Sequence, residues 1–307
     1  MTKVLIATEK PFAEKAINQI LMKLKQANFE IEFLERYTKK SELLRSAENA
    51  DAIIIRSDIL DKEVFDAVKN LKIVVRAGAG YDNVDLEAAT AKGVVVMNTP
   101  GQNSNAVAEL AMGLALYGIR NMFSGSTGAE LRGRTIGLHG YGYVARNVNR
   151  IAHGFGMDAV VFTHFSKVQA ISEGLKVADS LEELYAMSDV VSIHVPARGE
   201  HIKSVSYEVL QHLKQNAIIV NTARKEVINE EDLVNFMRFR PDVKYLSDIA
   251  PDNAAIFEKS LQGRFYFTPK KMGAQTAEAN INAGVAAAEQ IVNFILKGDK
   301  TFQVNKV

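Results

Sequence analysis

Short apolar runs alternate with amphipathic stretches along most of the chain. Residues 3–7 (KVLIA) form a continuous apolar run typical of a buried strand, and residues 13–27 place Ile20 and Leu24 on one face of a helix. The pattern then repeats, with further strands expected at 31–34, 52–55, 73–75 and 94–98, and further helices at 41–48, 61–69 and 86–92. Strands that alternate with helices predict a parallel, doubly wound sheet.

A second alternating series follows a long apolar stretch. Residues 104–121 are hydrophobic nearly all round, which predicts a helix buried between two bodies. After it, strands are expected at 136–138, 159–162, 190–195, 217–221, 245–249 and 264–267, with helices between them and a last long helix at 276–296. A chain of 307 residues has room for about two domains. The two series therefore predict an α/β protein with two doubly wound, Rossmann-like parallel sheets.

Residues 134–150 (RTIGLHGYGYVARNVNR) combine a strand, a tight turn and the start of a helix. Such a turn brings backbone N–H groups and a helix N-terminus up to a pyrophosphate. Gly140 permits the turn, Gly142 permits close approach of the phosphates, and Ala145 permits the helix to pack on the strand. The alternative is an ordinary glycine turn, but the flanking strand and helix favour a dinucleotide site.

Composition narrows the class of protein. The chain is 47% hydrophobic and 24% charged, and its formal net charge of +1 provides no global field for nucleic acid or an anionic membrane. It has no cysteine, which excludes disulfides, thiol nucleophiles and thiolate metal sites, and we expect no bound metal. No apolar stretch reaches the roughly eighteen residues of a membrane span. We therefore expect a cytoplasmic protein.

Charged and small residues follow two neighbouring strands of the first series. Arg56 and Ser57 come after the strand at 52–55, and residues 76–80 (RAGAG) come after the strand at 73–75. An arginine can bind a phosphate or carboxylate, and the backbone N–H groups of small residues can form an anion-binding nest. A surface arginine and a tight turn are the alternative. Arginines at adjacent strand ends favour an acidic substrate.

Polar residues also follow strands of the second series, where ligands bind in open α/β sheets. His194 and Pro196 close one strand, Arg224 comes just past another, and Asp248 lies near the end of a third. The loop at 268–273 (TPKKMG) carries two adjacent lysines between an apolar strand and a buried helix. A lysine pair is commonly a solvated surface, and that interpretation stays open for this loop.

Together these residues resemble the D-2-hydroxyacid dehydrogenase superfamily, and most closely its phosphoglycerate-oxidising branch. The matching segments cover nearly the whole chain and are residues 56–57, 75–84, 98–110, 133–145, 154–157, 194–196, 221–233 and 268–279. The resemblance implies NAD-dependent oxidation of 3-phosphoglycerate to 3-phosphohydroxypyruvate, the entry to L-serine biosynthesis. It also implies a homodimer with contacts near residues 108–130. The implied domains are a discontinuous, flavodoxin-like substrate-binding domain (1–98 plus 276–307) and an NAD-binding Rossmann domain (99–275).

The resemblance also assigns roles to individual residues. It implies that Arg56 and Ser57 contact the substrate phosphate and that Arg224 orients the substrate carboxylate. Further substrate contacts are implied for Ala77, Gly78, Ala79 and Asn103. The cofactor contacts that it implies are Gly140, Gly142, Tyr143, Val144, Thr163, His194, Val195, Pro196, Thr222, Ala223 and Asp248.

The first departures from the family concern its acid/base histidine and the glutamate that orients it. Aligning Met272-Gly273 with the family puts Lys271 at the histidine's place, and the glutamate falls near Asn253, with Asp252 and Glu258 the nearest acids. A lysine has no tautomer to fix, and its pKa must fall from about 10.4, which a paired carboxylate would oppose. We predict that Lys271 accepts the 2-hydroxyl proton. Lys270 is the alternative, because a shift of one residue in the loop would exchange the two lysines.

The third departure concerns the adenine ribose. The acidic residue expected about twenty residues past the glycine turn is absent, and Thr163-His164 stands there with Lys167 nearby. NAD is the cofactor that the family implies, and NADP is the alternative.

Two other functions remain open. One is a glyoxylate or hydroxypyruvate reductase using NAD(P)H, for which Arg56 would be less important. The other is a non-catalytic nicotinamide-sensing protein of the same fold. The chain ends soon after its last helix, so we expect no C-terminal serine-binding regulatory domain and no feedback inhibition through one.

Overall fold

The structure is a computed structural model that describes residues 1–164 and 167–306. The chain divides into two compact units, Met1–Asn103 with Thr276–Val307, and Ser104–Gln275. The chain thus passes from the first unit to the second after Asn103, whereas the family resemblance implied a boundary after residue 98. The segment between stays with the first unit because the Thr99 N–H donates to the Gly78 carbonyl (2.9 Å) and Thr99 is buried.

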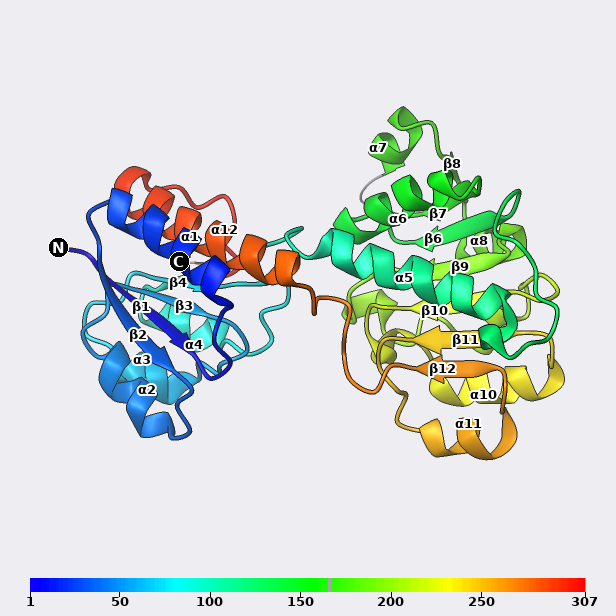
Figure 1. Cartoon of the computed structure of the whole chain (residues 1–307), viewed down its shortest axis with the longest axis horizontal. Helices are drawn as coiled ribbons and strands as arrows, with labels where there is room; N and C mark the ends of the chain where they lie inside the picture. The colour runs from blue at the N-terminus through cyan, green and yellow to red at the C-terminus, as the bar shows by residue number, and fades with distance from the viewer. Residues whose placement is uncertain (165–166, 307) are drawn as a thin grey trace. The chain divides into compact units, whose positions relative to one another are not determined.

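The first unit is a parallel sheet with strand order β2-β1-β3-β4-β5, the flavodoxin-like order. Its strands are β1 (Lys3–Thr8), β2 (Glu30–Glu35), β3 (Ala52–Ile55), β4 (Ile73–Arg76) and β5 (Val95–Asn98). Helices α1 (Glu14–Gln26) and α12 (Ala277–Lys297) cover one face (Figure 1). The other face is covered by α2 (Lys40–Ala47), α3 (Lys62–Ala67) and α4 (Leu86–Ala91). Because α12 comes from the C-terminal segment, this unit is discontinuous.

Continuous apolar strands make sense in this unit because both faces of the sheet are covered. Successive side chains of β3 point to opposite faces. Ile54 packs in the core beneath α1 and α12, whereas Ile53 and Ile55 pack in the core beneath α2 and α3. The expectation of a doubly wound sheet is therefore confirmed.

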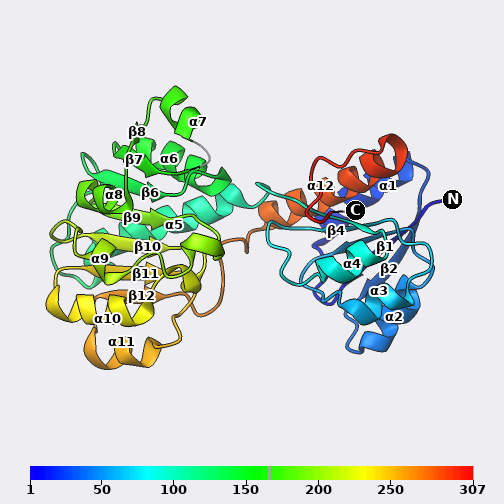
Figure 2. The same cartoon turned by 180° about the vertical axis from the view of Figure 1, so that it is seen from behind.

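The second unit is also a parallel sheet, with strand order β12-β11-β10-β9-β6-β7-β8. Its strands are β6 (Thr135–His139), β7 (Asp158–Phe162), β8 (Lys176–Val177), β9 (Val190–Ile193), β10 (Ile218–Asn221), β11 (Lys244–Ser247) and β12 (Phe265–Phe267). One face carries α5 (Ser104–Ile119), α6 (Tyr143–Gly154) and α7 (Lys167–Ser172). The opposite face, turned to the viewer in Figure 2, carries α8 (Leu181–Met187), α9 (Tyr207–Leu210), α10 (Glu230–Phe239) and α11 (Ala254–Ser260). Short 3-10 turns are η1 (Asn121–Phe123), η2 (Gly199–His201) and η3 (Lys225–Val227).

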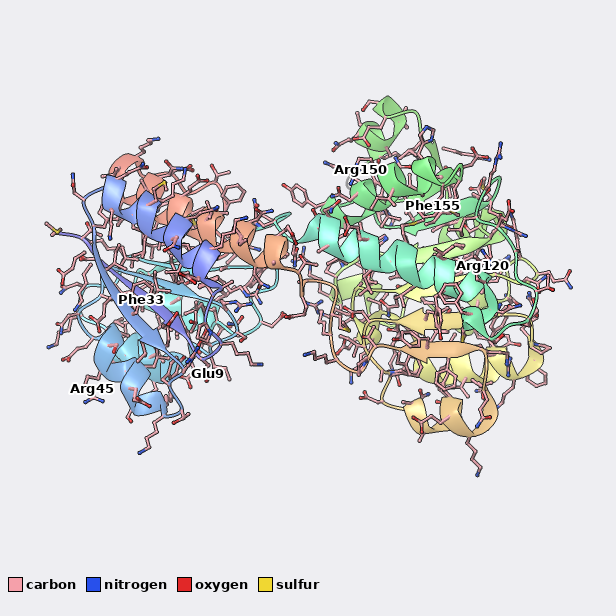
Figure 3. All side chains as sticks on the ribbon, viewed as in Figure 1. Glu9, Phe33, Arg45, Arg120, Arg150 and Phe155 are labelled. Carbon is pink, nitrogen blue, oxygen red and sulfur yellow. The ribbon has the colours of Figure 1, made fainter. Side chains whose placement is uncertain are left out.

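The sequence predicted that the apolar helix near residue 104 is buried between two bodies. Contacts inside the second unit account for its burial. Helix α5 packs against β10 and β11 and also against the neighbouring α6. A Cβ added at Gly118 would come within 2.9 Å of the Leu246 side chain, so the helix lies close on the sheet. Arg150 of α6, labelled in Figure 3, donates to Asn105 of α5 (2.7 Å). The helix thus has apolar contacts on more than one side.

Two strands are shorter than the sequence predicted. The strand expected at 190–195 ends at Ile193, and the strand expected at 245–249 ends at Ser247. His194 and Asp248 therefore lie just beyond strands rather than inside them. The prediction also missed β8, which is too short to show a period. No helix in the part of the chain that the structure describes is long and apolar enough to cross a membrane.

Candidate functional site

The carboxyl ends of the longer strands of the second sheet meet at one edge. The ladder register aligns His139 of β6 with Phe162 of β7 and Ile193 of β9, and it continues through the last residues of β10, β11 and β12. The residues that follow these ends form a row, in the order Thr163, Gly140, His194, Thr222, Asp248 and Thr268. The strand order reverses between β6 and β9, where open α/β sheets bind ligands.

The glycine turn after β6 confirms the strand, turn and helix predicted for residues 134–150. Gly140 has φ +93°, and a Cβ there would lie 2.7 Å from Val195 Cγ1 and 2.9 Å from the His194 carbonyl oxygen. Glycine is therefore required by the backbone and by its neighbours. Gly142 precedes the first turn of α6, and a Cβ there would meet no described atom within 4 Å. Ala145 is fully buried between helix and sheet.

A pocket of about 590 Å³ opens beside this turn. It brings together predicted cofactor residues from different strand ends, namely Gly140, Gly142, Thr163, His194, Val195 and Pro196. The remaining lining comes from His139, Tyr141, Phe162, His164, Arg198, Gly199, Glu200 and His201. The other predicted cofactor contacts, Tyr143, Val144, Thr222, Ala223 and Asp248, lie outside the pocket lining. Tyr143 is exposed at the start of α6, and Val144 packs on the apolar core.

His139 is a pocket residue that the sequence analysis did not single out. Its side chain is 1% exposed, and neither ring nitrogen has a hydrogen-bond partner among the described residues. Burial lowers its pKa to about 3, because the charged imidazolium would lose its solvation. Nε2 of His194 is likewise buried and unpartnered within the described chain, and burial lowers the pKa of His194 to about 3. The signal for His139 is a histidine in an apolar strand directly before the glycine turn.

The segment after β7 lacks a carboxylate, as the sequence indicates. Nε2 of His164 lies 3.8 Å from Oε1 of Glu200, across the pocket from the loop after β9. Lys167, which raised the alternative of a 2′-phosphate, lies 3.7 Å from Asp179 and is outside the pocket lining. Its charge is therefore directed to another part of the unit.

Asp248 holds the loop that carries the two lysines. Its Oδ1 accepts from the Met272 N–H (2.7 Å), and its Oδ2 accepts from the Gly273 N–H (2.9 Å). The Thr268 hydroxyl lies 3.1 Å from Oδ1. Asp248 is buried, so these charge-assisted bonds fix the loop firmly. The lysines next to these contacts are exposed at the same edge of the sheet.

Asn221, the last residue of β10, organises the segment that contains Arg224. Its Oδ1 accepts from the Ala223 N–H (3.0 Å), and its Nδ2 donates to the Arg224 carbonyl (3.0 Å). Arg224 Nη1 also donates to the Ala223 carbonyl (3.0 Å). The hydroxyl of Thr222 is buried, with no partner among the residues described. Strand β11 separates the end of β10 from the end of β12, which leads to Lys271.

The two acids near Asn253 differ in their surroundings. Asp252 forms an ion pair with Lys225, and Glu258 is exposed. Glu230 of α10 accepts from the backbone N–H groups of Asp252 (3.0 Å) and Asn253 (3.1 Å). Glu230 is thus the acid that contacts this segment, which the sequence analysis did not anticipate.

In the first unit, Arg56 and Arg76 lie at neighbouring strand ends. Ile55 aligns with Arg76 in the ladder, and Arg76 Nε donates to the Arg56 carbonyl (2.9 Å). Gly78 has φ +155°, and a Cβ there would overlap the Arg76 guanidinium at 1.4 Å from Nη1. Only glycine therefore leaves room for this arginine. The predicted backbone cradle and a guanidinium thus lie together at this edge.

The other predicted substrate residues surround these groups. Ser57 and Ala79 are exposed, Ala77 is buried, and Asn103 is half-buried just before α5. Asn98 Nδ2 donates to the Ala79 carbonyl (2.6 Å) and so holds this segment in place.

Asp58 is a buried carboxylate that shapes the end of β3. Its oxygens accept from the Arg56 N–H (3.0 Å), the Glu9 N–H (2.7 Å) and the Tyr37 hydroxyl (2.8 Å). Glu9, labelled in Figure 3, follows β1. These bonds join the ends of β1 and β3, and the hydrogen bond to Asp58 helps to raise the pKa of Tyr37 beyond the main effect of burial.

The chain belongs to the D-isomer specific 2-hydroxyacid dehydrogenase family, whose catalytic domain matches residues 5–305. It is 33% identical to D-3-phosphoglycerate dehydrogenase of Methanocaldococcus jannaschii, over 97% of this chain and 58% of that protein. The chain therefore spans little more than half the length of that relative. It is 31% identical to hydroxypyruvate reductase of Thermotoga maritima, over 91% of this chain and 94% of that protein. The solved structure of NAD+-bound 3-phosphoglycerate dehydrogenase from Entamoeba histolytica has 44% identity and a TM-score of 0.89, with 99% of each chain covered.

Proposed function

We propose that this protein is an NAD-dependent oxidoreductase that converts 3-phosphoglycerate to 3-phosphohydroxypyruvate. The observation that carries the proposal is the cation at the end of β3. The Arg56 guanidinium has no carboxylate within ion-pair distance among the described residues, and Arg76 Nε donates to the Arg56 backbone carbonyl. A phosphorylated 2-hydroxy acid supplies the negative charge that such a guanidinium binds. The similarity to the phosphoglycerate dehydrogenases of M. jannaschii and E. histolytica supports the same substrate.

The residues beside the glycine turn fit a dinucleotide. Gly142 leaves space for close approach at the start of α6, whose first-turn N–H groups suit a pyrophosphate. His194 Nε2 and the Thr222 hydroxyl are buried polar atoms without a partner in the described chain, as expected for groups that bind a ligand. The similar E. histolytica structure holds NAD+, and Lys167 lies beside Asp179 outside the pocket lining, so both observations support NAD as the cofactor.

In the proposed reaction the hydride goes to the cofactor, and residues of the protein bind the carboxylate and take the proton. A nicotinamide bound beside the glycine turn would supply the acceptor for the hydride from C2 of the substrate. Arg224 orients the substrate carboxylate through paired N–H donors. As the C2–H bond breaks, Lys271 accepts the 2-hydroxyl proton and the carbonyl forms, and in the reverse direction the lysine returns that proton. Asp248 keeps the lysine loop in position through the N–H groups of Met272 and Gly273.

A second candidate is a hydroxypyruvate or glyoxylate reductase. The T. maritima hydroxypyruvate reductase aligns over nearly its whole length with this chain. Such a substrate lacks the phosphate, so it would make little use of Arg56. The relative turnover of phosphorylated and unphosphorylated oxoacids therefore separates the two candidates.

The direct test measures reduced-nicotinamide absorbance as purified protein reduces 3-phosphohydroxypyruvate, hydroxypyruvate or glyoxylate with NADH or NADPH. Lys271→Ala should lower kcat by at least about a hundredfold, because general acid/base catalysis contributes roughly that much or more. Lys270→Ala is the matched control and should retain kcat within a few-fold. A Lys271→Ala protein with full turnover would refute the assigned acid/base. Absence of turnover by the wild-type protein would favour the nicotinamide-sensing alternative.

We further propose that the protein acts in L-serine biosynthesis as a homodimer. The exposed ring of Phe123 stacks edge-on against Tyr117 near the end of α5, in the region that the family resemblance implicates in dimer contacts. Light scattering of the purified protein would give the number of chains in the assembly.

A further inference from the structure

The guanidinium of Arg56 is held in the first unit by neutral acceptors. Nη1 donates to the backbone carbonyls of Lys10 (2.9 Å) and Pro11 (3.1 Å), and Nη2 donates to Oδ1 of Asn280 (2.5 Å). The ring centroid of Phe12 lies 5.1 Å from the guanidinium carbon, within cation–π range. These contacts orient the charge and do not cancel it. They also leave the Nε–H and one Nη2–H with no acceptor in the described chain.

Helix α12 contributes to these contacts through Asn280 and through its packing against Phe12. The Asn280 Nδ2 donates to the Thr276 carbonyl (2.8 Å), so the amide has one orientation and turns its oxygen toward Arg56. Gly284 lies one turn further along the same helix. A Cβ there would come within 3.0 Å of the Phe12 ring and 2.8 Å of the Ile20 side chain. Glycine at this position therefore lets Phe12 pack beneath the guanidinium.

An amide at residue 280 has a different effect from a carboxylate. A carboxylate would form an ion pair with Arg56 and compete with an incoming anion. The asparagine oxygen accepts the same hydrogen bond without neutralising the guanidinium. The ladder alignment of β3 and β4 places a second arginine, Arg76, next to the backbone of Arg56, to whose carbonyl Arg76 Nε donates.

We propose that Asn280 is a positioning residue that holds Arg56 ready for the phosphate group of the substrate. In this role it determines the preference for a phosphorylated over an unphosphorylated 2-hydroxy acid. The inference deepens the proposed function and rests on it. It concerns a residue on the C-terminal helix, distant in sequence from the strand end that it serves.

Steady-state kinetics with 3-phosphohydroxypyruvate and hydroxypyruvate test the inference in the 307-residue chain. Asn280→Ala should raise KM for the phosphorylated substrate roughly tenfold, because a hydrogen bond to a charged group is lost. Asn280→Asp should raise it further by neutralising Arg56, although the new ion pair leaves the thermal midpoint equal or higher. KM for hydroxypyruvate and both kcat values should stay within about twofold. Asn293→Ala, on the same helix, is the matched control.

Equal increases in KM for both substrates, or no increase for either, would overturn the inference. A loss of thermal stability in Asn280→Asp together with weaker binding of both substrates would also overturn it. Stabilisation by inorganic phosphate provides a readout that does not depend on turnover. If the wild-type protein reduces neither substrate, the proposed function fails. The role of Asn280 then stands if phosphate raises the thermal midpoint of the wild type more than that of Asn280→Ala, and it falls if the shifts are equal or absent.

Discussion

His139→Leu tests whether a buried imidazole makes this protein sensitive to acid. His139 ends β6 with both ring nitrogens unpartnered among the described residues, and burial lowers its pKa to about 3. In the unfolded chain a histidine titrates near 6.5. Below that pH the unfolded state binds a proton that the folded state does not, so stability falls as the pH decreases from about 6.5 toward 3.

The size of this loss of unfolding free energy follows from the two pKa values of His139, in the folded and in the unfolded chain. Between pH 7.5 and pH 5 the unfolded imidazole becomes almost fully protonated while the folded one stays neutral, which costs about 2 kcal/mol of unfolding free energy. Leucine has a similar size and does not titrate. The wild-type protein should therefore lose about 2 kcal/mol more than His139→Leu over this interval.

Urea unfolding at both pH values measures the difference. The chain has no tryptophan, so far-ultraviolet circular dichroism is the appropriate signal. His212→Gln, at an exposed position, controls for the loss of a histidine as such and should follow the wild type. Equal losses in the wild type and His139→Leu would show that the imidazole is solvated or partnered in the folded protein, and the argument from burial would be refuted.

Three further predictions concern the strand-end loops. Asp248→Asn replaces one of the two carboxylate oxygens that accept from Met272 and Gly273. The kcat should therefore fall roughly ten- to a hundredfold, while cofactor affinity changes little. An unchanged kcat would exclude positioning of the loop by this carboxylate. Gly140→Ala should destabilise the fold by about 2 kcal/mol or more, because of its positive φ and its close contacts. Gly142→Ala should leave the thermal midpoint unchanged but raise the cofactor Kd about tenfold, since an added methyl would have no atom of the described residues within 4 Å beyond its chain neighbours. Equal effects of the two glycine substitutions on stability would contradict this distinction.

The sequence predicted the secondary structure well because both sheets are covered on both faces. Strands such as Ala52–Ile55 must then be apolar at every position, and such runs are easy to recognise. The residues after the strands were also recognisable, because parallel strands end at one edge and polar residues there stand out. The strand near residue 190 was predicted too long because Val195 extends its apolar run beyond the last ladder pair.

The long-range contacts within each unit could not be read from the sequence. Asp248 was predicted to contact the cofactor, and the structure shows both its oxygens bound to the lysine loop. The contact between Arg56 and Asn280 joins residues at opposite ends of the chain. Neither residue type nor spacing indicates which of many asparagines will meet a given arginine.

By itself, the sequence determined the α/β class, the order of the elements and the glycine turn, and its motifs carried the resemblance to the family. The class, the order and the turn depend on local periodicity and on residues that are close along the chain. The tertiary structure decided which polar groups are satisfied and which are not, including the buried nitrogens of His139 and the neutral seat of Arg56. Those outcomes depend on solvation and on distances between elements far apart in sequence, which only packing of the folded chain establishes.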